Sequence, residues 1–200
     1  MYHSRVQLVL ASASPRRADL LRAAGFVFEV DPARTDESVL PGELAAAYVA
    51  RVARDKANVV RARHPWAAVI GADTTVVVED EILGKPSDRR AAVRMLTRLS
   101  GRTHDVLTGI SVVFGTRTAS AVEISRVRVA VLTPEEIRWY VDSGEPDDKA
   151  GAYAVQGLAS RFIEAVEGSY SNVVGLPVAR VYRLLRDLGF TGATATAARD

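Results

Sequence analysis

The stretch Ala67–Thr74 reads AAVIGADT, and it decides the fold. Its first six residues are a continuous apolar run, which is typical of a strand that is buried on both faces of a sheet. Asp73 follows at the carboxyl end of this strand, where open α/β sheets bind their ligands. An aspartate there can bind a metal or polarise a water, although a turn aspartate that caps its own backbone is the simpler alternative.

Helical and strand patterns alternate on both sides of this stretch. The alternation predicts an α/β fold, with a mixed twisted sheet and flanking helices. A central hairpin around the turn at 115–117 suggests a second lobe packed beside the first, with a cleft between the two as the natural ligand site. Strands are expected at 5–11, 26–30, 67–78, 106–114, 121–132 and 162–166, and helices at 15–24, 43–63, 88–99, 133–144 and 177–188. Residues 1–190 are expected to form one domain with two lobes, and 191–200 a frayed polar tail.

The overall composition excludes several classes of protein. The chain has 200 residues, no cysteine and a net charge of +2. Disulfides, thiolate metal sites and cysteine nucleophiles are therefore excluded, and the charge is too balanced to indicate a nucleic-acid binder. We find no signal peptide and no apolar run of the roughly 20 residues that span a bilayer. The expected location is the cytoplasm, without a membrane partner.

The run Ala11–Arg17 reads ASASPRR and predicts a turn from a strand into a helix. Ser14 fits the N-cap, and Pro15 fits the first helical position. Such a turn offers free backbone N–H groups to an anion, and Arg16 and Arg17 add two charged donors. A capped helix with two solvated arginines is the alternative.

Two lysines are candidates for binding phosphate. Lys56 falls among Val49, Val52 and Val59 on the apolar stripe of its expected helix, so it either extends to solvent or reaches an anion. The same helix is expected to bury Leu44 and Tyr48. Lys85 lies in a Gly-Lys-Pro segment, where the glycine allows close backbone approach and the lysine supplies a point charge.

The remaining candidates lie in loops. Asp36 and Glu37 are adjacent acids that matter only if the fold brings them to Asp73, where two carboxylates could share a divalent cation. Gln156 lies in the stretch 148–157, which could shape a base pocket, since the Gln156 amide both donates and accepts. An irregular loop packed by Tyr153 is the alternative. His104 is expected to be a structural hydrogen-bonding residue at a turn.

Taken together and in this order, these motifs resemble the Maf family of nucleoside triphosphate pyrophosphatases. The matching segments cover roughly residues 7 to 188, and they read LVLASASPRR, ARDKA, VIGADT, LGKP, LSGRTH, EPDDKAGAY with VQG, and VVGLP. The resemblance implies an inosine-triphosphatase-like fold, with two lobes around a central cleft and a homodimeric assembly. It also implies hydrolysis between the α and β phosphates of a nucleoside triphosphate, with a divalent cation, normally Mg2+ with Mn2+ as the alternative.

The resemblance also implies roles for individual residues. Asp73 matches the catalytic acid, which is assigned as the proton acceptor, and Glu37 matches an acid near the metal. Whether Asp73 is the base or chiefly a metal ligand is left open by the motif. The positions that match the phosphate side of the family's site are Ser12, Arg16, Arg17, Lys56 and Lys85.

Three further matches concern the substrate. The branch of the family that acts on dTTP and UTP carries arginine, threonine and glutamine where this chain has Arg16, Thr74 and Gln156. The branch that acts on 7-methyl-GTP has tryptophan, glutamine and glutamate there. The resemblance is therefore to the dTTP/UTP branch, with modified pyrimidine nucleotides as further substrates. A nucleotide-binding regulator linked to septum formation, with little turnover, is the alternative function.

Overall fold

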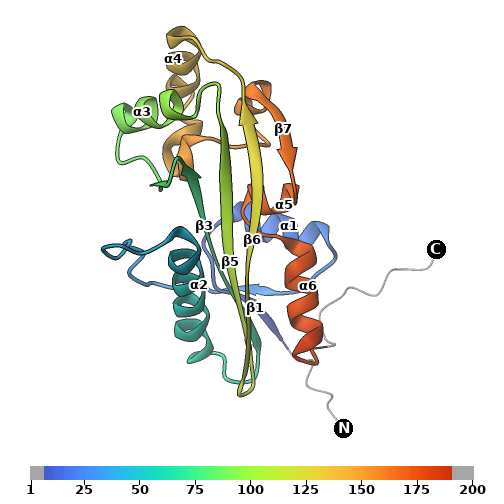
Figure 1. The fold of residues 1–200 in the computed structure, drawn as a ribbon. Coiled ribbons are helices and arrows are strands. Elements are labelled where there is room, and N and C mark those ends of the chain that lie inside the picture. Colours follow the sequence, from blue (N-terminus) through green and yellow to red (C-terminus); the bar gives the residue numbers. More distant parts are fainter. Residues whose placement is uncertain (1–6, 191–200) are drawn as a thin grey trace, which may run out of the picture.

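A seven-stranded sheet forms the centre of the computed structural model, which describes residues 7–190 (Figure 1). The strand order is β2-β1-β3-β5-β6-β7, and β4 pairs with β3 outside this path. The strands are β1 (Leu8–Leu10), β2 (Glu29–Val30), β3 (Ala68–Val78), β4 (Glu81–Leu83), β5 (Thr103–Phe114), β6 (Arg117–Val129) and β7 (Ile163–Glu167).

Strand directions divide the sheet into a parallel and an antiparallel part. β1 runs parallel to both β2 and β3, whereas β3, β5, β6 and β7 pair in antiparallel fashion. This arrangement confirms the predicted mixed α/β sheet. The register places Asp73 of β3 opposite Gly109 of β5, and Thr74 opposite Thr108. Asp73 therefore lies within a long β3 rather than at its end.

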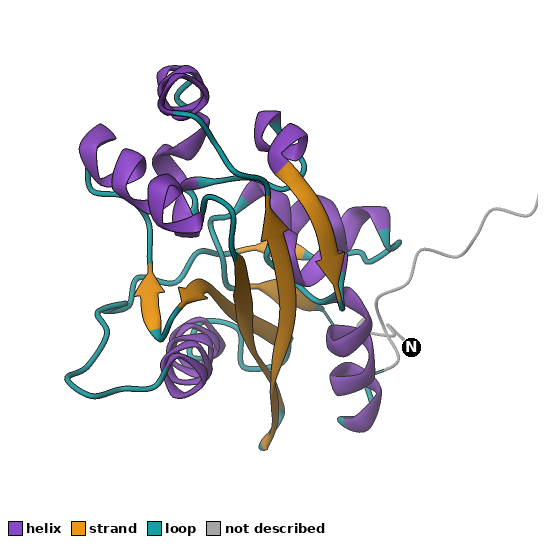
Figure 2. Cartoon of the chain, turned by 45° about the horizontal axis from the view of Figure 1, so that its top comes forward, coloured by secondary structure: helices purple, strands orange, loops and turns teal. Residues whose placement is uncertain are grey.

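Helices cover both faces of the sheet. α2 packs on β3 and β5, and α6 packs on the other side against β5 and β6 (Figures 1 and 2). None of the helices within residues 7–190 combines the length and the apolar character needed to cross a membrane. The α-helices are α1 (Pro15–Ala23), α2 (Ala45–Arg61), α3 (Arg89–Leu99), α4 (Pro134–Asp142), α5 (Tyr170–Val174) and α6 (Val178–Asp187), and the short 3-10 helices are η1 (Glu145–Asp148), η2 (Ala150–Ala152) and η3 (Leu158–Phe162).

Buried apolar side chains gather in two main clusters along the long strands. One includes Leu99 of α3 and Tyr140 of α4, and the other includes Leu21 of α1 and Leu185 of α6. β5 and β6 run through both regions, as Figure 1 shows. The division into two lobes of one domain stays a prediction, and the predicted tail at 191–200 lies outside the described residues.

The apolar face of α2 differs from the predicted one. Leu44 is the N-cap of the helix and is exposed, and Val59 is also exposed. Both were expected to be buried, but Leu44 precedes the first helical turn and Val59 lies one residue off the buried stripe. The residues that α2 buries are Val49, Val52, Ala53, Lys56, Ala57 and Val60.

The hairpin between β5 and β6 is tighter and longer than predicted. Gly115 and Thr116 alone separate the strands, and Gly115 adopts a φ of +60°, which permits so short a turn. β6 starts at Arg117 rather than at the predicted residue 121. Its first residues, such as Ser120, are polar because this part of the strand is exposed, so they gave no apolar strand pattern. The predicted capping box between Thr133 and Glu136 at the start of α4 is confirmed.

Candidate active site

A cavity of about 530 Å³ lies where the first turn, β3 and the late irregular segment meet. Its volume is within the usual range of small-molecule sites. Asp36, nominated together with Glu37, is not among the residues that line this cavity, but the other nine nominated residues are. They are Ser12, Arg16, Arg17, Glu37, Lys56, Asp73, Thr74, Lys85 and Gln156.

The turn into α1 forms one wall of the cavity. Ser14 is the N-cap and Pro15 opens the helix as predicted, although the Ser14 side chain makes no capping hydrogen bond. Ser12 is buried, and its hydroxyl accepts hydrogen bonds from the Ser14 backbone N–H at 3.3 Å and from Arg17 Nη1 at 3.0 Å. The Ser12 hydroxyl is thus fixed before any ligand arrives.

Arg17 is buried and gives most of its donors to the protein. Its Nε donates to Gly175 O at 2.7 Å, and Nη1 donates to Ala72 O at 3.0 Å as well as to Ser12. Nη2 donates to the Thr74 hydroxyl at 3.0 Å. Burial lowers the pKa of Arg17 from its ordinary value, while the charges of Asp73 and Glu37 act in the opposite direction. Arg17 therefore joins the first turn to β3 and to the end of α5.

Lys56 bridges the two carboxylates of the site. Its Nζ lies 2.8 Å from Asp73 Oδ1 and 2.9 Å from Glu37 Oε1. Lys56 and Asp73 are 6% and 5% exposed, so their charges face each other out of water. From the sequence, Lys56 could either extend to solvent or reach an anion. In the structure its Nζ contacts two anionic side chains, those of Asp73 and Glu37.

Two glycines let α2 come close enough for this contact. A Cβ on Gly71 of β3 would lie 2.1 Å from Ala53 O, and one on Gly109 of β5 would lie 2.1 Å from Val49 O. The backbone of α2 therefore rests directly on both strands. Because α2 lies this close to the sheet, the Lys56 side chain can reach Asp73 on β3.

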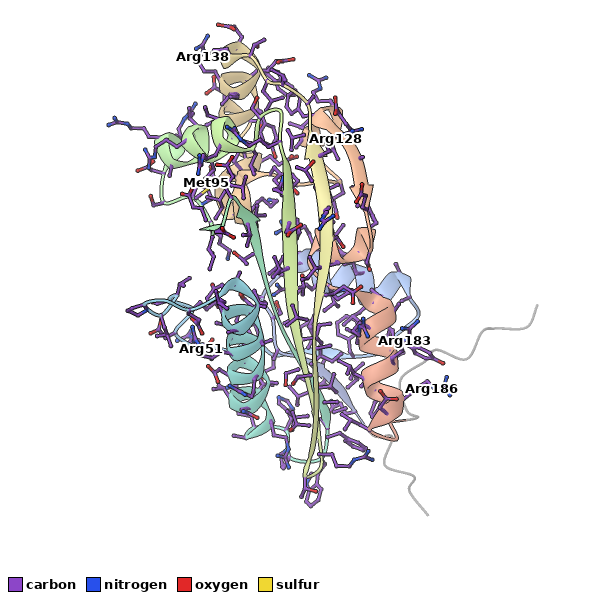
Figure 3. The ribbon with its side chains drawn as sticks, in the orientation of Figure 1. Arg51, Met95, Arg128, Arg138, Arg183 and Arg186 are labelled. Atoms are coloured by element: carbon purple, nitrogen blue, oxygen red, sulfur yellow. The ribbon has the colours of Figure 1, made fainter. Side chains whose placement is uncertain are left out.

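The loop that carries Glu37 is held by α2. Tyr48 OH donates to Glu37 O at 3.1 Å, and Arg51 Nη2 donates to Ser38 O at 2.9 Å. Arg51, labelled in Figure 3, also pairs with Glu43. Burial raises the pKa of Tyr48 to about 12, helped by the charges of Asp73 and Glu37. Tyr48 thus keeps its proton and holds the loop as a donor.

The carboxylate arrangement fits a divalent cation. Asp73 Oδ2 is buried and has no hydrogen-bond partner in the part of the chain that the structure describes. Glu37 is half-exposed at the same cavity. Mg2+ prefers oxygen ligands and is usually bound by one or two carboxylates together with phosphate oxygens and waters. Residues 7–190 contain no group of three His, Cys, Asp or Glu side chains placed for a metal.

Thr74 and Gly175 connect β3 to α5. The Thr74 hydroxyl lies 2.9 Å from the Thr108 hydroxyl and donates to Gly175 O at 3.2 Å. Gly175 O also accepts from Arg17. The Thr74 side chain, which the sequence placed among the selectivity positions, is therefore held by three neighbours.

The late segment 148–156 forms the opposite wall. Arg16 Nη1 lies 3.5 Å from Asp148 Oδ2 and so links the first turn to η1 across the cavity. Lys149, which also pairs with Asp148, lines the cavity together with Gln156. Lys85 is exposed at the same opening and lies just after β4.

His104 supports this wall from behind, on β5 rather than at the predicted turn. Its Nε2 lies 2.8 Å from Tyr153 OH, and Tyr153 lines the cavity. Burial lowers the pKa of His104 to about 4, so the ring is neutral near pH 7. The predicted structural role of His104 as a hydrogen-bonding residue fits these contacts.

The model of the family described as Maf-like protein matches residues 7–188. The chain belongs to this family. Among its relatives, a protein of Koribacter versatilis is 50% identical over 188 residues, covering 94% of this chain and 97% of the relative. A relative from Anaeromyxobacter sp. is 55% identical, covering 92% of this chain and 90% of the relative, and one from Myxococcus xanthus is 53% identical, covering 91% and 92%. All three relatives carry the name dTTP/UTP pyrophosphatase.

Some cavity residues of this Maf-like chain were not singled out from the sequence. Tyr48 stands at i, i+4, i+8 spacing with Val52 and Lys56, and that spacing could have placed it beside Lys56. Lys149 lies in the stretch 148–157 that was expected to shape a base pocket, but it was not nominated by itself. Tyr153 lies in the stretch 148–157 that was expected to shape a base pocket, but no local signal pointed to its contact with His104, because that contact joins segments about 50 residues apart.

Proposed function

We propose that this protein hydrolyses dTTP and UTP to the nucleoside monophosphate and pyrophosphate. The observation that carries the proposal is the buried bridge of Lys56 between Asp73 and Glu37, at the floor of a cavity whose walls hold further cations. Membership of the Maf-like family and the names of relatives about half identical to the chain support the substrate class.

Arg16, Lys56 and Lys85 bind the triphosphate in this proposal. All three line the cavity, and they come from α1, α2 and the segment after β4. Arg16 adds a planar pair of donors suited to phosphate. Arg17 has a different role, because most of its donors are bonded to the protein. It holds the Ser12 hydroxyl and Thr74 in place for the ligand.

A divalent cation, Mg2+ with Mn2+ as the alternative, would be held by Asp73 and Glu37 together with the phosphates. When bound, it neutralises phosphate charge and makes the α-phosphorus easier to attack. The unpartnered Oδ2 of Asp73 and the half-exposed Glu37 support this assignment. Lys56 keeps the two carboxylates side by side and offsets their mutual repulsion.

The chemical step transfers the nucleotidyl group to water. Water attacks the α-phosphorus, the bond from that phosphorus to the α-β bridging oxygen breaks, and pyrophosphate leaves with the electron pair. Oδ1 of Asp73 is already paired with Lys56, so Oδ2 is the oxygen that either accepts the proton of the water or holds the cation. It does not do both at once, because a carboxylate on a cation is a poor base. Arg16 and Lys85 stabilise the charge that develops on the leaving group.

Base selection is assigned to Arg16, Thr74 and Gln156. Gln156 is exposed at the cavity wall, where its amide can both donate to and accept from a pyrimidine edge. Modified pyrimidine nucleotides share that edge and are included among the proposed substrates. The support for this assignment is the position of all three side chains on one cavity.

The proposed setting of the enzyme follows the same resemblance. We place it in the cytoplasm as a homodimer, with a nucleotide as its substrate and without a nucleic-acid or membrane partner. The balanced net charge of +2 supports the absence of nucleic acid.

A panel of nucleoside triphosphates tests the function. Each nucleotide is incubated with the protein and Mg2+, and the release of pyrophosphate is measured. We expect turnover of dTTP and UTP well above that of purine nucleotides, and none after EDTA is added. A regulator linked to septum formation would bind nucleotide and release no pyrophosphate, which would refute the proposal.

A further inference from the structure

Gln156 lies on a turn whose shape the protein must fix. The turn begins at Ala154, whose carbonyl accepts from Gly157 N at 3.0 Å, and leads into η3. The Gln156 side chain makes no hydrogen bond within residues 7–190 and is exposed at the cavity. Its direction is therefore set by the backbone of the turn rather than by side-chain partners.

One carboxylate, that of Glu145, holds the far end of this turn. Glu145 Oε2 accepts from Leu158 N at 2.9 Å, and Oε1 accepts from Ala159 N at 3.3 Å. These are the free backbone donors at the start of η3, so Glu145 caps this short helix from another segment of the chain. Hydrogen bonds to an ionised carboxylate are stronger than neutral ones.

The same carboxylate holds the near end through Tyr140. Tyr140 OH donates to Glu145 Oε1 at 2.8 Å and accepts from Ala154 N at 3.2 Å. Tyr140 is fully buried on α4, so its hydroxyl is a fixed point. Ala154 and Leu158, on either side of Gln156, are thus tied to one side chain.

Gly157 leaves the space that Glu145 occupies. A Cβ at Gly157 would lie 2.1 Å from Glu145 Oε2 and 2.5 Å from its carboxyl carbon. The carboxylate therefore lies against the backbone next to Gln156, where no larger residue leaves room for it. Glu145 and Gly157 form a matched pair.

We propose that Glu145 is a positioning residue for base selection, which acts by fixing the turn that carries Gln156. The inference rests on the proposed function of the cavity. Glu145 is not among the residues that line the cavity, so it acts through the turn and not by touching the nucleotide. Changing it should therefore alter nucleotide binding and base preference, while the reacting end at Asp73 keeps its geometry.

The first test compares Glu145→Gln with Asp147→Asn. Glutamine keeps the shape but turns an NH2 group toward backbone donors, so one hydrogen bond to the turn is lost. We expect KM for dTTP to rise roughly tenfold and the preference for dTTP over dGTP to fall by a similar factor, with kcat for dTTP within about twofold. Asp147 is an exposed acid on the same 3-10 helix, without a side-chain bond to the turn, and its variant should behave as wild type.

The second test is a double-mutant cycle with Gly157→Ala. Alone, this change forces a methyl group against Glu145 and should reduce the preference for dTTP. In a Glu145→Ala background the space is free, so adding Gly157→Ala should change the preference by less than about twofold. If the double variant lowers the preference for dTTP by the product of the two single effects, Glu145 and Gly157 act independently, and the proposal of a matched pair is wrong.

Thermal unfolding and nucleotide binding complete the experiment. A lower Tm for Glu145→Gln with an unchanged base preference would mean a structural role only, and would overturn the proposal. Dissociation constants are also measured for dTTP and dGTP analogues with a non-hydrolysable α-β bridge. If wild-type protein binds these analogues without turning over dTTP, the proposed enzyme function fails. The ratio of the two constants in the variants then still decides the role of Glu145.

Discussion

Lys56 carries its charge into a nearly dry environment, and the two carboxylates that receive it explain why it is there. An unpaired buried ammonium would be strongly unfavourable, whereas contacts of 2.8 and 2.9 Å to Asp73 and Glu37 compensate for the lost water. The three charges sum to a single negative charge, in a cavity whose other walls carry arginine and lysine side chains. The second oxygen of Asp73, unpartnered within the described chain, is the group that gives this arrangement a chemical use.

Asp73→Asn tests this residue directly. Asparagine has the same shape and still accepts from Lys56, so the fold and the Tm should stay close to those of wild type. It cannot accept the proton of the attacking water and binds a cation weakly, so kcat for dTTP should fall by about 100-fold or more. Pyrophosphate release and thermal unfolding are measured together. Asp105→Asn is the matched control, because Asp105 lies on the adjacent β5 and its one ion pair within residues 7–190 is with surface Arg126. Turnover by Asp73→Asn at the control's rate would remove Asp73 from the reaction.

The roles of the neighbouring residues Arg16 and Arg17 could not be told apart from the sequence. Arg16 and Arg17 were both assigned to phosphate, yet Arg16 faces the cavity and Asp148, while Arg17 is buried on protein acceptors. Both line the cavity, but adjacent helical residues point about 100° apart, and here only Arg16 keeps most of its donors unbonded within residues 7–190. Which one does so depends on where α5 and the carbonyl of Ala72 lie, and no local pattern contains that information.

At the scale of the element, the contact between α2 and the sheet decides the geometry of the site. Gly71 and Gly109 lie on adjacent strands, and each has its Cα directly beneath the backbone of the helix. The missing side chains bring the helix nearer than ordinary packing allows. Lys56 and Tyr48 are consequently both placed at the cavity.

Gly109→Ala should therefore damage the site as well as the fold. The added methyl group meets Val49 O and must push α2 outward, which should lower the free energy of unfolding by about 1–3 kcal/mol. The same movement draws Lys56 away from Asp73, so kcat/KM should fall roughly tenfold or more at a temperature where the variant is folded. Urea unfolding and dTTP kinetics provide the two measurements.

Val112→Ala supplies the comparison for this variant. Val112 is buried on β5 in the cluster that α6 covers, away from α2. Its truncation should cost stability without moving Lys56, so activity per folded molecule should stay near wild type. Equal activity for the two variants would show that the close approach of α2 is irrelevant to the site.

Elements were predictable to the extent that their own residues specify them. The apolar run before Asp73 and the capping box of α4 are local signals, and both predicted their elements well. The buried stripe of α2 was partly wrong because small residues, Ala53 and Ala57, take the central contacts where larger ones were expected. The bonds from Tyr48 to the Glu37 loop and from Glu145 to η3 join separate segments, so they emerge only from the packed fold.

In the whole molecule, the cavity is assembled from segments spread along the chain. The first turn, α2, β3 and the segment 148–156 each supply walls, and the link from Arg16 to Asp148 joins residues 132 positions apart. Sequence order alone could nominate these segments through the family resemblance. It could not show that they meet, which depends on the parallel pairing of β1 with β3 and on the long β5–β6 hairpin.

A ligand that fills this cavity should therefore stabilise the molecule as a unit. A dTTP analogue with a non-hydrolysable α-β bridge, present with Mg2+ at 100 times its dissociation constant, adds about 2.7 kcal/mol to the free energy of unfolding. For a chain of this size, that corresponds to a rise in Tm of roughly 5–10 °C. Differential scanning fluorimetry measures the shift. Lys85→Ala removes a positive charge from the cavity opening and should weaken triphosphate binding. The rise in Tm at the same analogue concentration should therefore be smaller. Two outcomes would contradict the assignment of this cavity to the triphosphate. One is a Tm rise in Lys85→Ala equal to that of wild type, and the other is no Tm rise in wild-type protein at saturating analogue.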